Sequence, residues 1–198
     1  IVLGLMLATT LFSASFATGD TLTHSIRTLV VSWLGEVDVI VASEAQAPSG
    51  GPTYFDMSQY EAVRDRLSSV PEVEGVAPQI HEVVPVLAPA TRLGEPVVHV
   101  LGIAEERMLG FGRLVDDRGN TLSLSTLSPG QAYISSEVAE ELDANSGDAL
   151  QLFLGTQPST VEVSGIYEKG AETAPELSIV MPLAQLQALM GTEGTITA

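Results

Sequence analysis

The chain has 198 residues and carries 25 Asp and Glu against 8 Lys and Arg, which gives a formal net charge of −17 at pH 7. A surface this acidic repels nucleic acid and anionic lipid headgroups, so we exclude nucleic-acid binding. With 45% hydrophobic residues the chain can bury a core, and its lack of cysteine excludes disulfides, thiolate zinc sites and a lipidated cysteine anchor.

The first segment, residues 1–19, contains no charged residue. Seventeen apolar or small residues in a helix reach about 26 Å, close to the ~30 Å hydrocarbon core of a bilayer. Because the chain opens with Ile, we interpret the segment as the end of a longer transmembrane helix. A cleaved secretory signal is the alternative, with Ser15-Phe16-Ala17 as its cleavage site.

The next segment, residues 20–35, has the pattern of an amphipathic stem helix that ends near a glycine. Its apolar side chains recur at spacings of four, three and four: Leu22, Ile26, Leu29 and Trp33. This continuation favours a membrane helix over a cleaved signal. We predict that the four side chains pack against a partner helix or against their own domain.

A strand and a loop are predicted after the stem. Residues 36–43 alternate Val37, Val39 and Val41 with other side chains, which predicts a mostly buried strand. Residues 44–53 are rich in Pro, Gly and Ser and predict a loop.

A helix is predicted from Asp56, which is a suitable N-cap. Tyr60, Val63 and Leu67 form its apolar face, and Pro71 ends it.

Two strands, residues 79–89 and 96–103, are predicted to follow that helix. Pro85 must lie at an edge or a bulge, because proline has no N–H to donate to a strand ladder. Residues 104–126 show weak periodicity, and we interpret them as a linker into a second lobe.

The second lobe is predicted to contain several short strands and two helices. A serine, Ser135 or Ser136, caps the first helix, and Val138 and Leu142 are its buried pair. Pro182 opens the second helix. The predicted strands are residues 132–134, 149–154, 160–167, 177–181 and a start at 195–198. The apolar face of the second helix is Leu183, Leu186 and Met190, with Gly191 after it.

The sequence contains no pattern of histidines or catalytic motifs that indicates a metal site or a catalytic site. The three histidines, His24, His81 and His99, have no metal-ligand spacing. The last two lie in neighbouring predicted strands, where a cross-strand pair is conceivable, but two histidines without a third ligand bind zinc poorly. Hydrolase and phosphate-binding motifs are missing from the sequence. We therefore expect no enzyme, no metal and no cofactor.

The order of segments resembles the extracytoplasmic domain of ABC-transporter permeases of the MacB/FtsX/LolC type. An apolar helix continues as a stem and is followed at once by the strand DVIVAS. A helix ends in VPEVEGVAPQI. The most specific passage is PGQAYISSEVAEELDANSGDALQLFLG, followed by VEVSGIYEKG.

The resemblance implies an α+β fold of two lobes. The first, Porter-like lobe covers residues 36–115 and is incomplete, and a β-rich, Sabre-like inserted lobe covers residues 116–191. Residues 192–198 begin the return to the first lobe, which is expected to continue past Ala198. The family has no catalytic residues in this domain.

The resemblance also implies a function in transport or mechanotransmission, coupled to ATP hydrolysis by a partner ABC ATPase subunit. It implies a place in the plasma (inner) membrane, with residues after about 20 on the extracytoplasmic side. Expected partners are the membrane, a second permease subunit in a homo- or heterodimer, and a peptide, lipoprotein or extracytoplasmic protein as cargo. A membrane-anchored or secreted binding or adhesion module is the alternative.

Overall fold

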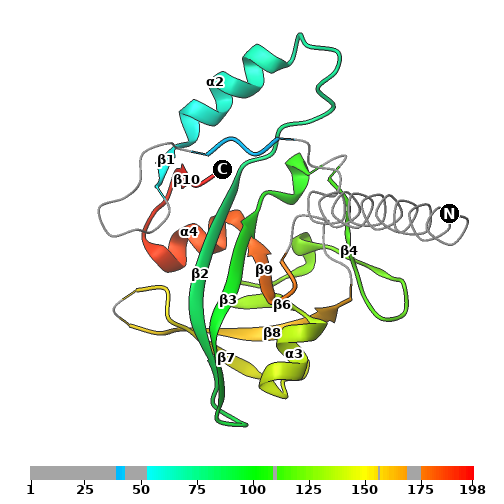
Figure 1. Ribbon diagram of the computed structural model, residues 1–198, viewed down its shortest axis with the longest axis vertical. Coiled ribbons are helices and arrows are strands. Elements are labelled where there is room, and N and C mark those ends of the chain that lie inside the picture. Colours follow the sequence, from blue (N-terminus) through cyan, green and yellow to red (C-terminus); the bar gives the residue numbers. More distant parts are fainter. Residues whose placement is uncertain (1–38, 43–52, 109–110, 156, 169–174) are drawn as a thin grey trace, which may run out of the picture.

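The computed structural model describes residues 39–42, 53–108, 111–155, 157–168 and 175–198 (Figure 1). Within these ranges the mixture of α-helices and short strands confirms the predicted α+β class. The elements in chain order are β1 (Phe55–Asp56), α2 (Met57–Leu67), β2 (Gln79–Ala88), β3 (Leu93–Ile103), η1 (Glu105–Arg107), β4 (Leu114–Val115), β5 (Thr121–Leu122), η2 (Leu124–Thr126), β6 (Gln131–Ser135), α3 (Ser136–Leu142), β7 (Ala149–Leu152), β8 (Ser159–Tyr167), β9 (Ser178–Pro182), α4 (Leu183–Met190) and β10 (Thr195–Ile196).

Six strands close into a barrel in the order β2–β3–β9–β6–β8–β7. The β3–β9 and β6–β8 pairs are parallel and the other pairs are antiparallel. Closure leaves no strand edge unpaired within the barrel. Each strand sends side chains into the main core, including the fully buried Ile80, Val98, Ile134, Leu150 and Ile179.

A second, smaller core lies on the outer side of β3, β6 and β9. Successive strand residues point to opposite faces, so Ile134 enters the main core while Tyr133 enters the second. The second core is covered by the segment that the sequence analysis interpreted as a linker. Leu114 of β4 and Leu124 of η2 are each 5% exposed there. The linker prediction for residues 104–126 is therefore wrong. Isolated apolar residues at irregular spacing give no periodic signal, so the sequence did not indicate their burial.

The long hairpin of β2 and β3 confirms the prediction for Pro85. The pairing register shifts between Val84 and Val86, so the proline lies at an irregularity of the ladder. Its carbonyl oxygen accepts a hydrogen bond of 3.1 Å from Phe153 N, just after β7. Pro85 thus takes part in the sheet through its carbonyl oxygen, at a position where no backbone N–H is needed.

The helix caps also agree with the sequence analysis. Asp56 caps α2 and accepts a 2.8 Å hydrogen bond from Ser58 N. Ser135 caps α3 by accepting a 3.2 Å bond from Val138 N. Gly191 ends α4 with φ at 66°, the left-handed conformation in which glycine carries no Cβ penalty.

The predicted strand at residues 36–43 differs from the structure where the two can be compared. Residues 39–42 lie outside any strand, and Val39, Ile40 and Val41 are 75%, 57% and 54% exposed. A buried strand is therefore the wrong prediction for these four residues. Alternating valines show that a segment can form a strand, but a strand also needs a hydrogen-bonding neighbour, and none of the described strands pairs with residues 39–42.

The expected boundary between lobes at residues 115 and 116 falls inside the connectivity of the barrel. Residues 99–103 of β3 pair with residues 178–182 of β9, and β2 pairs with β7 at Val86 and Leu87. Strands expected in different lobes therefore share one barrel. Pairing between distant segments leaves no trace in local periodicity.

A smaller unit lies beside the barrel, and we call it the α2 unit: residues 53–78 together with residues 192–198. In it β1 and β10 form a two-stranded antiparallel sheet next to α2 (Figure 1). None of the helices in the described ranges is both long and apolar enough to cross a bilayer. The predicted membrane helix, residues 1–19, and stem, residues 20–35, lie outside the described residues.

Candidate functional site

The barrel meets the α2 unit at a hydrogen-bonded contact that we call the joint. Its centre is the backbone of Gln79 at the start of β2. Gln79 N donates to Ala198 O at 2.9 Å, and Thr197 N donates to Gln79 O at 3.0 Å. His81 N donates to the Thr197 hydroxyl oxygen at 2.9 Å, and Thr197 is buried. These bonds fix the last residues of the chain alongside the first strand of the barrel.

The same C-terminal segment also holds the start of α2. Phe55 pairs with Ile196 and Asp56 with Thr195 in the β1–β10 sheet, and Met57 N donates to Gly194 O at 2.8 Å. Residues 194–198 therefore bond to β1 on one side and to β2 on the other. A displacement of either neighbour acts on this segment directly.

A tyrosine–carboxylate pair crosses the joint between Tyr54 and Glu82. The Tyr54 hydroxyl donates to Glu82 Oε1. Burial raises the pKa of the Glu82 carboxyl above its ordinary value, and burial likewise raises the pKa of the Tyr54 hydroxyl. The tyrosine therefore stays protonated and remains the donor near neutral pH.

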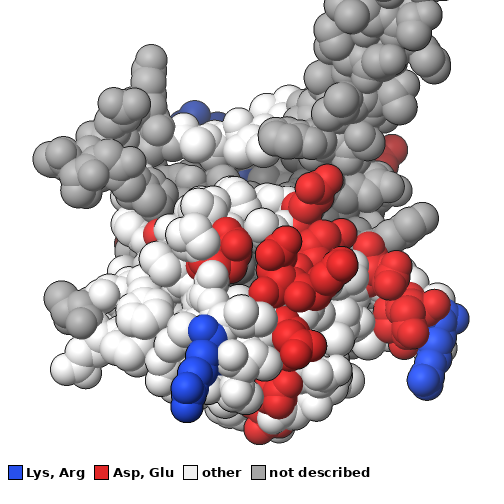
Figure 2. All heavy atoms as spheres, turned by 60° about the horizontal axis from the view of Figure 1, so that its bottom comes forward, with Lys and Arg blue, Asp and Glu red and all other residues white. Residues whose placement is uncertain are grey.

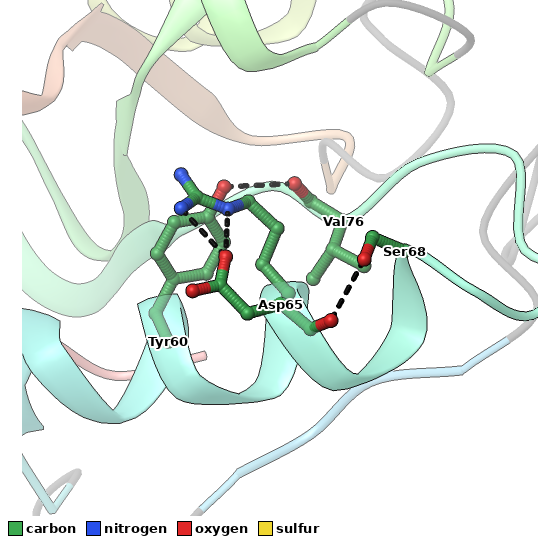
Figure 3. A network of polar contacts seen from close by, with 5 residues as sticks. Tyr60, Asp65, Ser68 and Val76 are labelled. Atoms are coloured by element: carbon green, nitrogen blue, oxygen red, sulfur yellow. Dashed lines mark hydrogen bonds and ion pairs between the residues drawn. The ribbon is translucent and has the colours of Figure 1, made fainter.

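A second tyrosine fastens α2 to the segment that follows it. Tyr60 is 5% exposed, and its hydroxyl donates to Val76 O at 3.0 Å (Figure 3). Two guanidinium groups face its ring: Arg64 at 5.8 Å and Arg107 at 5.1 Å from the centroid. Cation–π contacts at partly exposed sites contribute about 0.5–1 kcal/mol. Because Arg107 belongs to η1, Tyr60 also links α2 to the end of β3.

Two histidines from neighbouring strands meet on the outer side of the barrel close to the joint. His81 Nε2 and His99 Nδ1 are 2.7 Å apart, a hydrogen bond in which one neutral ring donates to the other. Burial lowers the pKa of both rings, and for His81 the proximity of His99 lowers it further. The cross-strand pair that the sequence allowed is therefore formed. Within the described residues, no three His, Asp or Glu side chains come close enough to hold a metal ion.

The four residues of the predicted stem-helix interface, Leu22, Ile26, Leu29 and Trp33, lie outside the described residues. The structure brings together residues that the sequence analysis did not select as a site, above all Gln79, Thr197 and Tyr54. The sequence analysis marked only the strand starts at residues 79 and 195, and a strand start gives no indication of its partner. The joint offers mechanical linkage and hydrogen bonding between its two sides.

Comparison with known families gives this arrangement its context. The chain matches the sequence profile of the MacB-like periplasmic core domain over residues 1–198. It belongs to this family. The MacB-like periplasmic core domain is a part of ABC transporter permeases and is not typically an enzyme. This confirms the resemblance inferred from the sequence.

Solved structures that are similar to the chain share little sequence with it. The extracellular domain of the noncanonic ABC-type transporter YknZ from Gram-positive bacteria is 20% identical, with a TM-score of 0.50 over 78% of this chain and 76% of that one. The periplasmic region of MacB from Actinobacillus actinomycetemcomitans is 14% identical, with a TM-score of 0.49 over 70% of this chain. The chain covers 61% of that MacB region. No curated protein matches the chain.

Proposed function

We propose that this MacB-like domain is the outer part of a permease subunit and transmits movement between the membrane and the space outside it. A partner ATPase supplies the energy by hydrolysing ATP. The family match over the whole chain supports this assignment. The joint supports it most directly, because residues 194–198 bond to β1 within the α2 unit and to β2 of the barrel.

In this proposal residues 1–19 end a membrane helix of the plasma (inner) membrane, residues 20–35 are the stem, and the rest lies on the extracytoplasmic side. The described hydrogen bonding suggests lobes that differ from those first expected. The inserted, β-rich lobe is the barrel with α3 and α4, residues 79–191, and the α2 unit belongs to the first lobe. Movement of the stem then reaches the barrel through the joint.

The work done outside is the handling of a peptide, lipoprotein or extracytoplasmic protein, and the permease acts as a homo- or heterodimer. The barrel is held together by a closed set of strand pairs, and the α2 unit adds Tyr60 and Ile196 to the same core, so a displacement of the α2 unit acts on the barrel. This is the property that a transmitting domain needs. A stiff stem is needed as well, since a helix that bends would absorb the movement.

The test breaks the stem in the full-length permease. Ser25→Pro removes a backbone hydrogen bond and costs about 3 kcal/mol or more within a helix. We expect the variant to abolish the transport or signalling activity while the partner ATPase still hydrolyses ATP. Ser25→Ala, the matched control, leaves both intact.

Two measurements in membranes check this: ATP hydrolysis, and the activity outside. Full outer activity of Ser25→Pro at a normal level of membrane-inserted protein would show that the stem does not transmit movement.

A further inference from the structure

The two histidines on the outer side of the barrel are arranged as a chelating pair. In the antiparallel β2–β3 ladder His81 pairs with Leu101 and Val83 pairs with His99, so the histidines are diagonal neighbours on adjacent strands. Because alternate strand residues share a face, both side chains leave the sheet on the same side. The ring centroids are 5.0 Å apart and the rings are tilted by 36°. This arrangement directs one nitrogen of each ring toward the other.

The spacing of these nitrogens matches what one transition-metal ion requires. His81 Nε2 and His99 Nδ1 are 2.7 Å apart. Metal–imidazole bonds of about 2.0–2.1 Å place two nitrogens about 2.9 Å apart at a right angle and about 3.3 Å apart at the tetrahedral angle. The observed spacing is closer to the right-angle value. Square-planar sites of nitrogen and oxygen ligands are typical of Cu²⁺ and Ni²⁺.

The proton shared by the two rings does not prevent metal binding. A neutral imidazole carries one proton, which can reside on either ring nitrogen. With His81 protonated at Nδ1 and His99 at Nε2, both facing nitrogens present a lone pair. The hydrogen bond between the rings is lost, and two metal–nitrogen bonds replace it.

The pair is open to solvent and free of charged neighbours on its own strands. Both histidines are half-buried, so part of each ring remains accessible to an ion. Glu82 follows His81 in the chain but lies on the opposite face, with Ile80 and Val84. Among the described residues no third His, Asp or Glu joins the pair, so water occupies the remaining coordination positions.

The carboxylates of this acidic chain are a separate attraction for cations. They are concentrated on the end of the molecule that faces the viewer in Figure 2. The helix at that end, α3, carries Glu137, Glu140 and Glu141. Carboxylates suit Mg²⁺ and Ca²⁺, whereas imidazole suits transition metals. A net charge of −17 raises the concentration of all cations near the protein, and the choice among them falls to the histidines.

We propose that His81 and His99 together bind an exchangeable divalent transition-metal ion, with Cu²⁺ bound most tightly. Affinity for nitrogen ligands rises from Mn²⁺ through Ni²⁺ to Cu²⁺ and falls again at Zn²⁺. Two histidines without a third ligand hold zinc poorly, which agrees with the expectation that the domain has no resident metal. The ion is a ligand taken from the surroundings and not a cofactor.

This site connects metal binding to the folded strand pair beside the joint. The two ligands are 18 residues apart in the chain and meet only when β2 and β3 are paired. The backbone N–H of His81 also donates to the Thr197 hydroxyl at 2.9 Å. An ion that binds only the folded state stabilises it, so Cu²⁺ is expected to raise the melting temperature.

The test titrates chelator-treated full-length protein in detergent with CuCl₂ at pH 7.5. Cu²⁺ is paramagnetic, and the remote nitrogen of each bound imidazole modulates the pulsed electron paramagnetic resonance signal, so one and two imidazoles are distinguished. We expect a site with two imidazoles. This spectrum is recorded on the unaltered protein and does not depend on the folding of any variant.

Variants assign the two imidazoles to residues. His81→Gln and His99→Gln are each expected to weaken Cu²⁺ binding about ten-fold or more and to abolish the two-imidazole signal. His24→Gln, outside the described residues, and Glu140→Gln on α3 are the matched controls and should change neither. Zn²⁺ should bind the unaltered protein about ten-fold more weakly than Cu²⁺, or less.

A signal from one imidazole or from oxygen ligands alone would overturn the inference. So would Cu²⁺ binding that is unchanged in both His81→Gln and His99→Gln, or that is lost in Glu140→Gln instead. None of these results bears on the proposed function, which requires no metal.

Discussion

The barrel and the α2 unit are built in opposite ways. Every strand of the barrel has two hydrogen-bonded neighbours, and its interior is filled by fully buried side chains. The α2 unit has two strands of two residues each and a helix of 11 residues in which only Tyr60 is buried. Isolated helices shorter than about 12–15 residues are marginal in water. The barrel is thus stable through its own core, whereas the α2 unit depends on what it is attached to.

This difference tells us which part moves as a rigid body. Local opening is easiest where few apolar contacts are buried and backbone hydrogen bonds are exposed to solvent. On that basis we expect the amides of all six barrel strands, β2 and β3 included, to exchange with solvent together and slowly. We expect the amides of α2 to exchange faster.

The largest expected effect comes from removing a core side chain of the barrel. Leu150 is fully buried, so Leu150→Ala should lower the free energy of unfolding by about 2–5 kcal/mol, from lost burial and the cavity left behind. Leu67→Ala, at the partly exposed end of α2, should lower it by about 1 kcal/mol or less. Denaturant unfolding of the two variants measures both values. Equal losses would mean that the α2 unit is as tightly packed as the barrel.

A smaller effect is expected where α2 is fastened. Tyr60→Phe keeps the ring but removes the hydrogen bond to Val76 O, which is worth about 0.5–1.5 kcal/mol. Hydrogen exchange should become faster in residues 57–67 and stay unchanged in the barrel strands. Ser68→Ala, which removes an exposed hydroxyl that donates to Asp65 O, serves as the control and should change exchange less. Faster exchange throughout the barrel would contradict the view that the α2 unit is a separate, weaker body.

The smallest effect concerns the histidine pair beside the joint. Folding lowers the pKa of both His81 and His99, so the folded protein binds fewer protons than the unfolded chain below about pH 6.5, the ordinary histidine value. Their contribution to stability is therefore present at pH 7.5 and is lost as the pH falls through the range below 6.5.

The measurement for the pair is the melting temperature from pH 7.5 to 5. Protonation of carboxylates also changes stability in this acidic protein, so the comparison is with the double variant His81→Gln/His99→Gln. We expect the melting temperature of the unaltered protein to fall more, relative to the double variant, as the pH decreases. Melting temperatures that fall in parallel for the two proteins would show that folding does not lower the pKa of His81 and His99.

Sequence patterns predicted the parts of the fold that depend on neighbours in the chain. Caps at Asp56 and Ser135, the irregular ladder at Pro85 and the stop at Gly191 each follow from the chemistry of one residue and its next few neighbours. The same reasoning failed for residues 39–42, since their alternation carries no information about a pairing partner. It also failed for Leu114 and Leu124, whose burial depends on distant strands.

The candidate site was still harder to predict. Gln79 and Thr197 are 118 residues apart, as the hydrogen bond between them shows, and nothing local marks either of them. The contact of His81 with His99 could be foreseen as a possibility because both lie in adjacent predicted strands, but the register that brings their nitrogens together depends on the bulge and on barrel closure. Closure of the barrel itself depends on the parallel β3–β9 and β6–β8 pairs, which join segments on either side of the expected lobe boundary.

The hydrogen bonds between Gln79 and residues 197–198 have a further consequence. They place the beginning of β2 beside the end of the chain described here, so the chain leaves the α2 unit and comes back to it at nearly one point. Relative to the α2 unit, the barrel is therefore one long insertion whose two ends are held together by these hydrogen bonds. The cost of closing a loop grows only slowly with its length. Insertions and deletions can accordingly enlarge or shorten the barrel during evolution while the α2 unit keeps its geometry.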